Sequence, residues 1–251
     1  QLAAVLLVIT FIPIRRYGLP GNLPFNMEPY RLLVIVLILG WLASLLIDDR
    51  VRIRRTGFEA PLAAFGLAVI GSLAANTHRI AALGVQPEVI KRCMFFLSFF
   101  LVMALFASVI RSEKAVLTLV EVLVGGGAVV AFLALVEARN GYNFFNHLQQ
   151  FLPVLKLTEL PIVPERGARL RVYASAQHPI ALGALFVMLV PLAVYLAQST
   201  GRRRWYGALG LLTLGTISTV SRTSILMLTV VAVVFLILRP RQTRRLWPVL
   251  F

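Results

Sequence analysis

The sequence predicts an all-α fold, a polytopic bundle of transmembrane helices. Hydrophobic residues fill 59% of the 251 positions and charged residues only 14%, whereas soluble domains carry about 25% charged residues. The apolar residues also form several long, nearly unbroken runs, and a bilayer core of roughly 30 Å needs about 20 such residues per helix. We therefore expect about eight to nine helices to cross a membrane.

The apolar runs place these helices in order. Pro61 near the start of one run fits the first turn of a helix, where its missing N–H needs no partner. Three glycines at 125–127 favour close packing with another helix or a local break. The predicted helices span residues 1–14, 32–47, 60–75, 93–110, 115–136, 179–197, 205–219 and 223–238, and a ninth begins at 246.

Basic residues are concentrated in alternate loops. The net charge is +15, and the loops at 48–57, 111–114, 201–204 and 239–245 are densely basic. Such loops face the cytoplasm under the positive-inside rule, so the intervening loops lie outside. Basic and aromatic residues do not interleave in a stripe, which argues against a nucleic acid partner and leaves membrane lipids as the expected surroundings.

The domain organisation follows from this topology. We predict N-terminal transmembrane helices at 1–136, an extracytoplasmic loop at 137–178, and further transmembrane helices at 179–251. Both ends of the sequence lie within apolar runs, so we interpret the chain as a fragment of a longer protein. The single cysteine, Cys93, excludes an internal disulfide and a zinc site built from several thiolates.

The outer loop contains an amphipathic stretch at 142–160. Phe144, Leu148, Phe151, Leu152 and Leu155 share one helical face, and Pro153 should bend or end the helix. The pattern fits a helix that lies in the membrane interface, and it fits equally a helix that packs on the others without contacting a ligand.

Arg166, Arg169 and Arg171 follow this stretch, just before the helix that begins at Pro179. Guanidinium groups bind phosphate through paired hydrogen bonds, and a helix N-terminus adds partial positive charge. The cluster is a candidate pyrophosphate site. The alternative is that these arginines contact lipid headgroups or balance Glu165.

Arg222 interrupts the last long apolar stretch at a predicted outer turn. Ionisable residues at such a depth are costly and usually face a cavity or a partner. Ser221 and Thr223 could support it through their hydroxyl groups. The alternative is an ordinary arginine in a short turn.

Two further residues have open roles. His178 fits a general base or a helix cap. Glu121 fits a proton carrier in a transporter or a structural contact with a neighbouring helix. The three histidines are scattered, and no acidic pair typical of a magnesium or manganese site occurs in the outer segments, so we predict no metal site and no cofactor.

Two motifs resemble a known family. The string from Arg171 through Tyr173 and His178 to Gly183 opens a helix after the outer loop, and Ser221-Arg222 opens the helix two later. This arrangement resembles the O-antigen ligase and polymerase family of bacterial membrane glycosyltransferases. The likeness is concentrated in residues 166–238, and Ile180 stands where family members often have Asn.

The resemblance implies a GT-C-like fold in a multi-pass protein of the bacterial plasma membrane. It implies that an undecaprenyl-pyrophosphate-linked glycan is polymerised or transferred to a glycan or lipid acceptor at the outer face. Arg171 and Arg222 would be catalytic, and Arg166, Arg169, Tyr173, His178 and Ser221 would contact substrate. The arginines would stabilise charge on the leaving pyrophosphate in place of a metal ion.

Other functions fit the same fold class, because fold alone does not decide function. One is a transporter of a small anion such as bicarbonate, which would need paired polar residues at mid-membrane and broken helices. Another is a membrane scaffold without catalytic activity.

Overall fold

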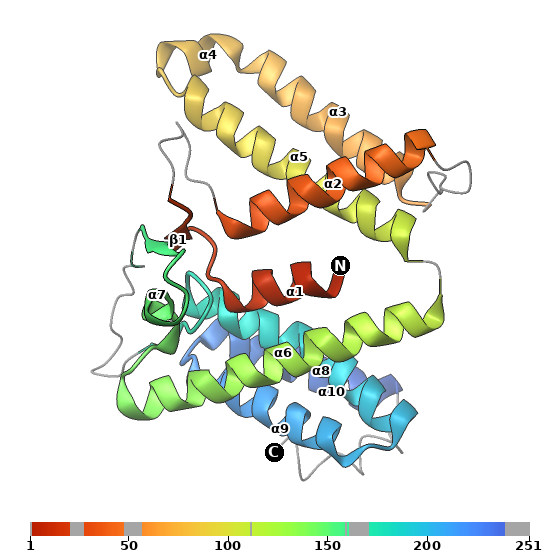
Figure 1. The fold of residues 1–251 in the computed structure, drawn as a ribbon, viewed down its shortest axis with the longest axis vertical. Coiled ribbons are helices and arrows are strands. Elements are labelled where there is room, and N and C mark those ends of the chain that lie inside the picture. The colour runs from red at the N-terminus through yellow and green to blue at the C-terminus, as the bar shows by residue number, and fades with distance from the viewer. Residues whose placement is uncertain are drawn as a thin grey trace. The chain divides into compact units, whose positions relative to one another are not determined.

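The computed structural model describes residues 2–20, 28–47, 57–110, 112–158, 160 and 171–238. Within these residues the fold is all-α, as predicted, apart from one short antiparallel strand pair in which Tyr17 pairs with Leu157 (Figure 1). The helices are α1 (Leu2–Phe11), α2 (Pro29–Ile47), α3 (Glu59–Ala75), α4 (Thr77–Ala82), α5 (Gln86–Val109), α6 (Glu113–Asn140), the 3₁₀ helix η1 (Phe144–Asn146), α7 (Leu148–Phe151), α8 (Pro179–Thr200), α9 (Arg203–Ser218) and α10 (Arg222–Leu238). The strands are β1 (Tyr17–Gly18) and β2 (Lys156–Leu157).

Four of the described helices, α2, α5, α6 and α8, are long and apolar enough to cross a membrane. The apolar helices α1, α3 and α10 are shorter, at 10 to 17 residues. The described helices therefore indicate a membrane protein, with fewer full-length candidate spans than the sequence predicts.

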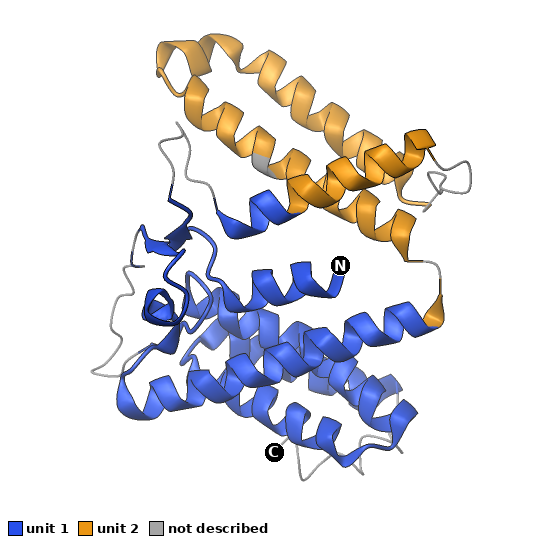
Figure 2. Cartoon of the chain, in the orientation of Figure 1, with its two compact units in different colours: residues 1–33, 114–251 blue, residues 34–113 orange. Residues whose placement is uncertain are grey.

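The chain divides into two compact units, which Figure 2 shows in different colours. Unit 1 comprises residues 1–33 and 114–251, and unit 2 comprises Val34–Glu113. In unit 2, Phe65 of α3 contacts Phe96 and Phe100 of α5 at ring-centroid distances of 6.1 and 6.0 Å. The predicted division at residues 136 and 178 concerns membrane topology and stays a prediction.

The core of unit 1 forms where α8, α9 and α10 pack on one another and on α6. Small residues allow these close approaches. A Cβ added at Gly127 of α6 would overlap Leu189 of α8, and one added at Gly215 of α9 would lie 2.9 Å from Ala131 of α6. The three glycines at 125–127 therefore leave α6 unbroken. Gly126 allows α1 to pack closely on α6, and Gly127 does the same for α8.

One expectation about helix boundaries was wrong, that of a loop between the helices predicted at 60–75 and 93–110. The segment at 76–91, expected to be a loop, contains α4 and the first turns of α5. Helix α5 begins early because Pro87 stands in its first turn with Glu88, which forms an i,i+4 ion pair of 3.3 Å with Arg92. The predicted ninth helix and the loops at 48–56 and 239–245 lie outside the described residues.

The amphipathic stretch at 142–160 does not form one helix. It consists of η1, α7 and β2, and the backbone leaves helical geometry at His147. Tyr17 explains part of this, since its hydroxyl donates to the Phe145 carbonyl (2.9 Å) and accepts from the Leu148 N–H (3.1 Å). The predicted apolar face is divided, because Leu148 and Leu155 are buried whereas Phe151 and Leu152 are exposed.

Candidate functional site

The segment 171–178, which precedes α8, is held by a buried polar network within unit 1. The Arg16 guanidinium donates to the backbone carbonyls of Ala174 (3.0 Å) and Ala176 (2.7 Å). It also donates to Asn146 Oδ1 (2.9 Å) and lies over the Tyr173 ring, 5.0 Å from its centroid. A single side chain, directly before β1, thus contacts both η1 and the segment that leads into α8.

Glu137, in the last turns of α6, completes this network. Its carboxylate accepts from the backbone N–H groups of Ala174 (2.9 Å) and Tyr173 (3.3 Å). Arg16 and Glu137 are only 2% and 6% exposed, so each depends on its protein partners. Ala174 has a positive φ of 39°, a strained conformation for a residue with a side chain, and it is bonded at both its N–H and its carbonyl.

Burial sets the electrostatics of this region. It lowers the pKa of Arg16 from its ordinary value, while Tyr173, Tyr17 and Glu137 act in the opposite direction. Burial likewise raises the pKa of Tyr17, against the hydrogen bond from Leu148 and the charge of Arg16. The neutral phenol is the form that donates to the Phe145 carbonyl.

Arg171 lies directly before this network. Its side chain is 9% exposed, and its Nε atom is buried without a hydrogen-bond partner in the part of the chain that the structure describes. A buried guanidinium donor without a partner is costly. Arg166 and Arg169, predicted to act beside it, lie outside the described residues.

Tyr173 and His178 take part in local contacts. The Tyr173 hydroxyl accepts from Asn146 Nδ2 at 3.0 Å. His178 caps α8, because its Nδ1 accepts from the Ile180 N–H at 3.2 Å. Of the two roles considered for His178, the structure places it in the cap.

Arg222 is the first residue of α10, and its side chain is exposed. Ser221 is buried, and its hydroxyl accepts from the Ser224 N–H at 3.4 Å, so it caps α10. Val220, immediately before this pair, has a positive φ of 49°. The tight turn and the cap together fix the direction in which α10 starts.

The starts of α8 and α10 lie against each other. A Cβ added at Gly183, in the second turn of α8, would overlap the Ser224 side chain in the first turn of α10. It would also lie 3.2 Å from Thr219 Oγ1. The chain segments that carry Arg171 and Arg222 therefore lead into neighbouring helix ends.

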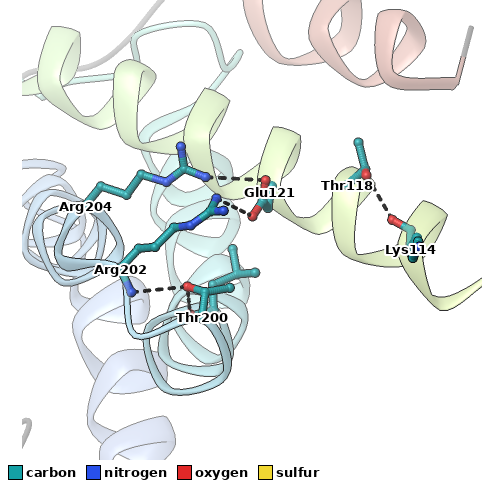
Figure 3. Close-up of polar contacts among 7 residues, drawn as sticks. Lys114, Thr118, Glu121, Thr200, Arg202 and Arg204 are labelled. Carbon is teal, nitrogen blue, oxygen red and sulfur yellow. Dashed lines mark hydrogen bonds and ion pairs between the residues drawn. The ribbon is translucent and has the colours of Figure 1, made fainter.

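A separate charged cluster joins α6 to α9. Glu121 pairs with Arg202 (3.7 Å) and Arg204 (3.4 Å), and Figure 3 shows both guanidinium groups directed at its carboxylate. Of the two roles considered for Glu121, this geometry matches the structural contact between helices.

Sequence patterns missed the network around segment 171–178. Arg16 and Glu137 each belong to a polar stretch at the end of an apolar run, a position that ordinarily faces water. Among the described residues, no three His, Cys, Asp or Glu side chains lie together as a candidate metal site. Comparisons with protein-family models, curated proteins and solved structures give no match.

Proposed function

We propose that this protein is a membrane glycosyltransferase of the O-antigen ligase or polymerase type. It transfers or polymerises an undecaprenyl-pyrophosphate-linked glycan on a glycan or lipid acceptor. The reaction takes place at the outer face of the bacterial plasma membrane, in a multi-pass GT-C-like bundle of about eight to nine helices. The observation that carries the proposal is that the starts of α8 and α10 are in contact, with Arg222 at the first position of α10 and Arg171 in the segment that leads into α8.

The position of Arg222 favours a ligand. The N-terminus of a helix carries partial positive charge, so a cation there is unfavourable by roughly 0.3–1 kcal/mol. Arg222 nevertheless occupies the first position of α10 and is exposed. A bound anion would reverse the sign of this interaction, because both the helix end and the guanidinium would then attract it.

Arg171, in the segment that precedes α8, also favours a bound anion. Its buried Nε has no partner among the described residues, and a phosphate oxygen is a strong acceptor for such a donor. The planar fork of arginine matches phosphate through two parallel bonds. Two arginines placed in this way could hold the pyrophosphate of the donor and stabilise the charge that develops as the glycosidic bond breaks.

The backbone near the two proposed catalytic arginines is strained, which favours fixed positions for their side chains. The three residues other than glycine with positive φ in the described part of the chain are Arg15, Ala174 and Val220. Ala174 and Val220 are close in sequence to the two proposed catalytic arginines, and Arg15 adjoins Arg16. Backbone strain of this kind, at about 1–3 kcal/mol per residue, is concentrated at functional sites in proteins.

The direct test is reconstitution of the full-length protein in proteoliposomes with an undecaprenyl-pyrophosphate-linked glycan and an acceptor glycan. We expect transfer with release of undecaprenyl pyrophosphate, and no transfer from a donor that carries a single phosphate. Proteoliposomes that leave the donor intact but take up labelled bicarbonate would instead support an anion transporter.

A further inference from the structure

A groove of about 540 Å³ runs between α6 and α9 within unit 1, away from the proposed catalytic segments. Its polar end carries Glu121 and Arg204, and most of the remaining lining is apolar or small. The apolar and small lining residues are Val122, Gly125, Ala128, Gly207, Ala208 and Leu211. Arg204 and Leu211 are seven positions apart on one helix, or about 10 Å along its axis.

The charged end of the groove has unused capacity for an anion. Arg202 and Arg204 face one carboxylate, that of Glu121, so the cluster in Figure 3 retains net positive charge. Both pairs are long, at 3.7 and 3.4 Å, and the two arginine side chains are 60% and 56% exposed. Each guanidinium has five N–H donors, most of which these pairs leave available.

Trp205 supplies an independent indication of a missing partner. It lines the groove and is only 5% exposed, yet its Nε1 donor has no hydrogen-bond partner within the described residues. The guanidinium of Arg204 lies over its ring, 4.4 Å from the centroid. Tryptophan is enriched at membrane interfaces, where its ring contacts acyl chains and its N–H contacts polar headgroup atoms.

Two glycines keep the groove open. A Cβ built at Gly125 or at Gly207 would meet no atom of the described residues within 4 Å. Glycine inside a helix lowers its stability relative to alanine, and no packing contact explains either one. Their absent side chains leave space along the apolar part of the groove.

We propose that this groove binds an anionic phospholipid from the leaflet that the basic loops face. Arg202 and Arg204 bind the phosphate, a headgroup or ester oxygen accepts from Trp205, and one acyl chain lies between α6 and α9. The combination of a cationic rim with an apolar floor matches a lipid, whereas a free phosphate would use only the rim. The proposal is independent of the glycan-transfer function.

Quenching of Trp205 fluorescence by brominated lipids tests the proposal. In the full-length protein, every tryptophan except Trp205 is replaced by phenylalanine, including Trp41 and Trp247. The protein is then reconstituted with dibrominated phosphatidylglycerol or dibrominated phosphatidylcholine in otherwise identical membranes. We expect phosphatidylglycerol to be preferred by about fivefold or more, the factor that basic side chains near an anionic headgroup contribute.

Matched variants locate the site. Arg204→Gln should remove most of the preference, and Gly125→Leu should lower quenching by both lipids. Arg203→Gln removes the same charge from the same turn, but its side chain neither lines the groove nor pairs with Glu121, as Arg202 and Arg204 do, so it should keep most of the preference.

Three results would overturn the proposal. Equal quenching by the two lipids would mean that the groove holds only bulk lipid. Absence of quenching by either lipid would mean that another protein segment covers it. A preference that survives Arg204→Gln would place the headgroup elsewhere. Because the first comparison uses unaltered groove residues, it holds even if a variant fails to fold.

Discussion

Arg16 and Ala174 are 158 positions apart in the sequence and are joined by a buried hydrogen bond of 3.0 Å. The backbone N–H of Ala174 donates to the Glu137 carboxylate at 2.9 Å. The strained turn before α8 is thus held between Arg16, a cation directly before β1, and Glu137, a carboxylate from α6. Arg171 lies three positions before Ala174 and eight positions before α8 begins, so the two hydrogen bonds that hold the turn also constrain the position of the Arg171 backbone.

The first prediction concerns Arg16. Arg16→Gln removes a buried cation and leaves the carbonyls of Ala174 and Ala176 without their donor. We expect a loss of about 3 kcal/mol in stability and faster hydrogen exchange in residues 171–176. Thermal unfolding in detergent and exchange mass spectrometry measure the two effects. Arg15→Gln is the matched control, because Arg15 is adjacent, equally charged and exposed. Equal effects in both variants would contradict the proposed role of the network.

The second prediction concerns Glu137. Glu137→Gln keeps one carbonyl oxygen but replaces the other acceptor with an NH₂ group that would face a backbone N–H. We expect a loss of about 1–2 kcal/mol, measured by thermal unfolding, together with faster exchange at Tyr173 and Ala174. Glu113→Gln, at the exposed start of the same helix, should leave exchange at Tyr173 and Ala174 unchanged and lower stability by no more than the roughly 0.3–1 kcal/mol of a charge at a helix N-terminus. An unchanged exchange rate in Glu137→Gln would show that the two hydrogen bonds do not hold the turn.

The third prediction concerns the contact between α8 and α10. Gly183→Ala would place a methyl group on the Ser224 side chain, so we expect a loss of about 1–3 kcal/mol. Gly207→Ala meets no neighbouring atom among the described residues and should gain up to about 1 kcal/mol from helix propensity. Adding Ser224→Gly to Gly183→Ala should recover part of the loss. If Gly183→Ala is as stable as the parent protein, the two helix ends are not in close contact.

The fourth prediction concerns topology. In a Cys93→Ser background, single cysteines at Ile53 and Gln150 report the two predicted sides of the membrane. Gln150 is exposed in α7, so a membrane-impermeant thiol reagent should label it on spheroplasts. Cysteine at Ile53 should be labelled only after the membrane is permeabilised, because its loop is densely basic. The reverse pattern would place the two arginines on the cytoplasmic side and exclude the proposed reaction there.

The sequence predicted those parts of the fold that depend on local composition. Long apolar runs located most of the helices, and the starts of α8 and α10 lie within one residue of their predicted positions. The stretch at 142–160 was mispredicted because its apolar spacing suits one helix. In the structure the helix is interrupted, and the Leu148 N–H donates to the Tyr17 hydroxyl, 131 positions away in the sequence. Side chains such as Arg16 gave no signal, because their partners are distant in sequence.

The residues of the candidate site also fall into those that local sequence indicates and those that depend on distant partners. Arg222 could be singled out because it interrupts an apolar run, a local feature. The sequence left His178 open between a general base and a helix cap, and its bond with the Ile180 N–H matches the cap. The capping role of Ser221 became visible only with its backbone partner in place. The groove between α6 and α9 was missed altogether, because its rim and floor come from helices more than 60 positions apart.

The central claim is that Arg171 and Arg222 converge on the lipid pyrophosphate. Its most direct test measures transfer from an undecaprenyl-pyrophosphate-linked glycan by the full-length protein and its Arg171→Ala, Arg222→Ala and corresponding Lys variants. Membrane abundance and thermal stability are matched, and Arg139→Ala, at the exposed end of α6, is the control. A lost charged hydrogen bond of roughly 1.5–3 kcal/mol predicts that each alanine variant is about 10- to 100-fold slower, with incomplete rescue by lysine. Near-full activity of both alanine variants at normal abundance would contradict the account.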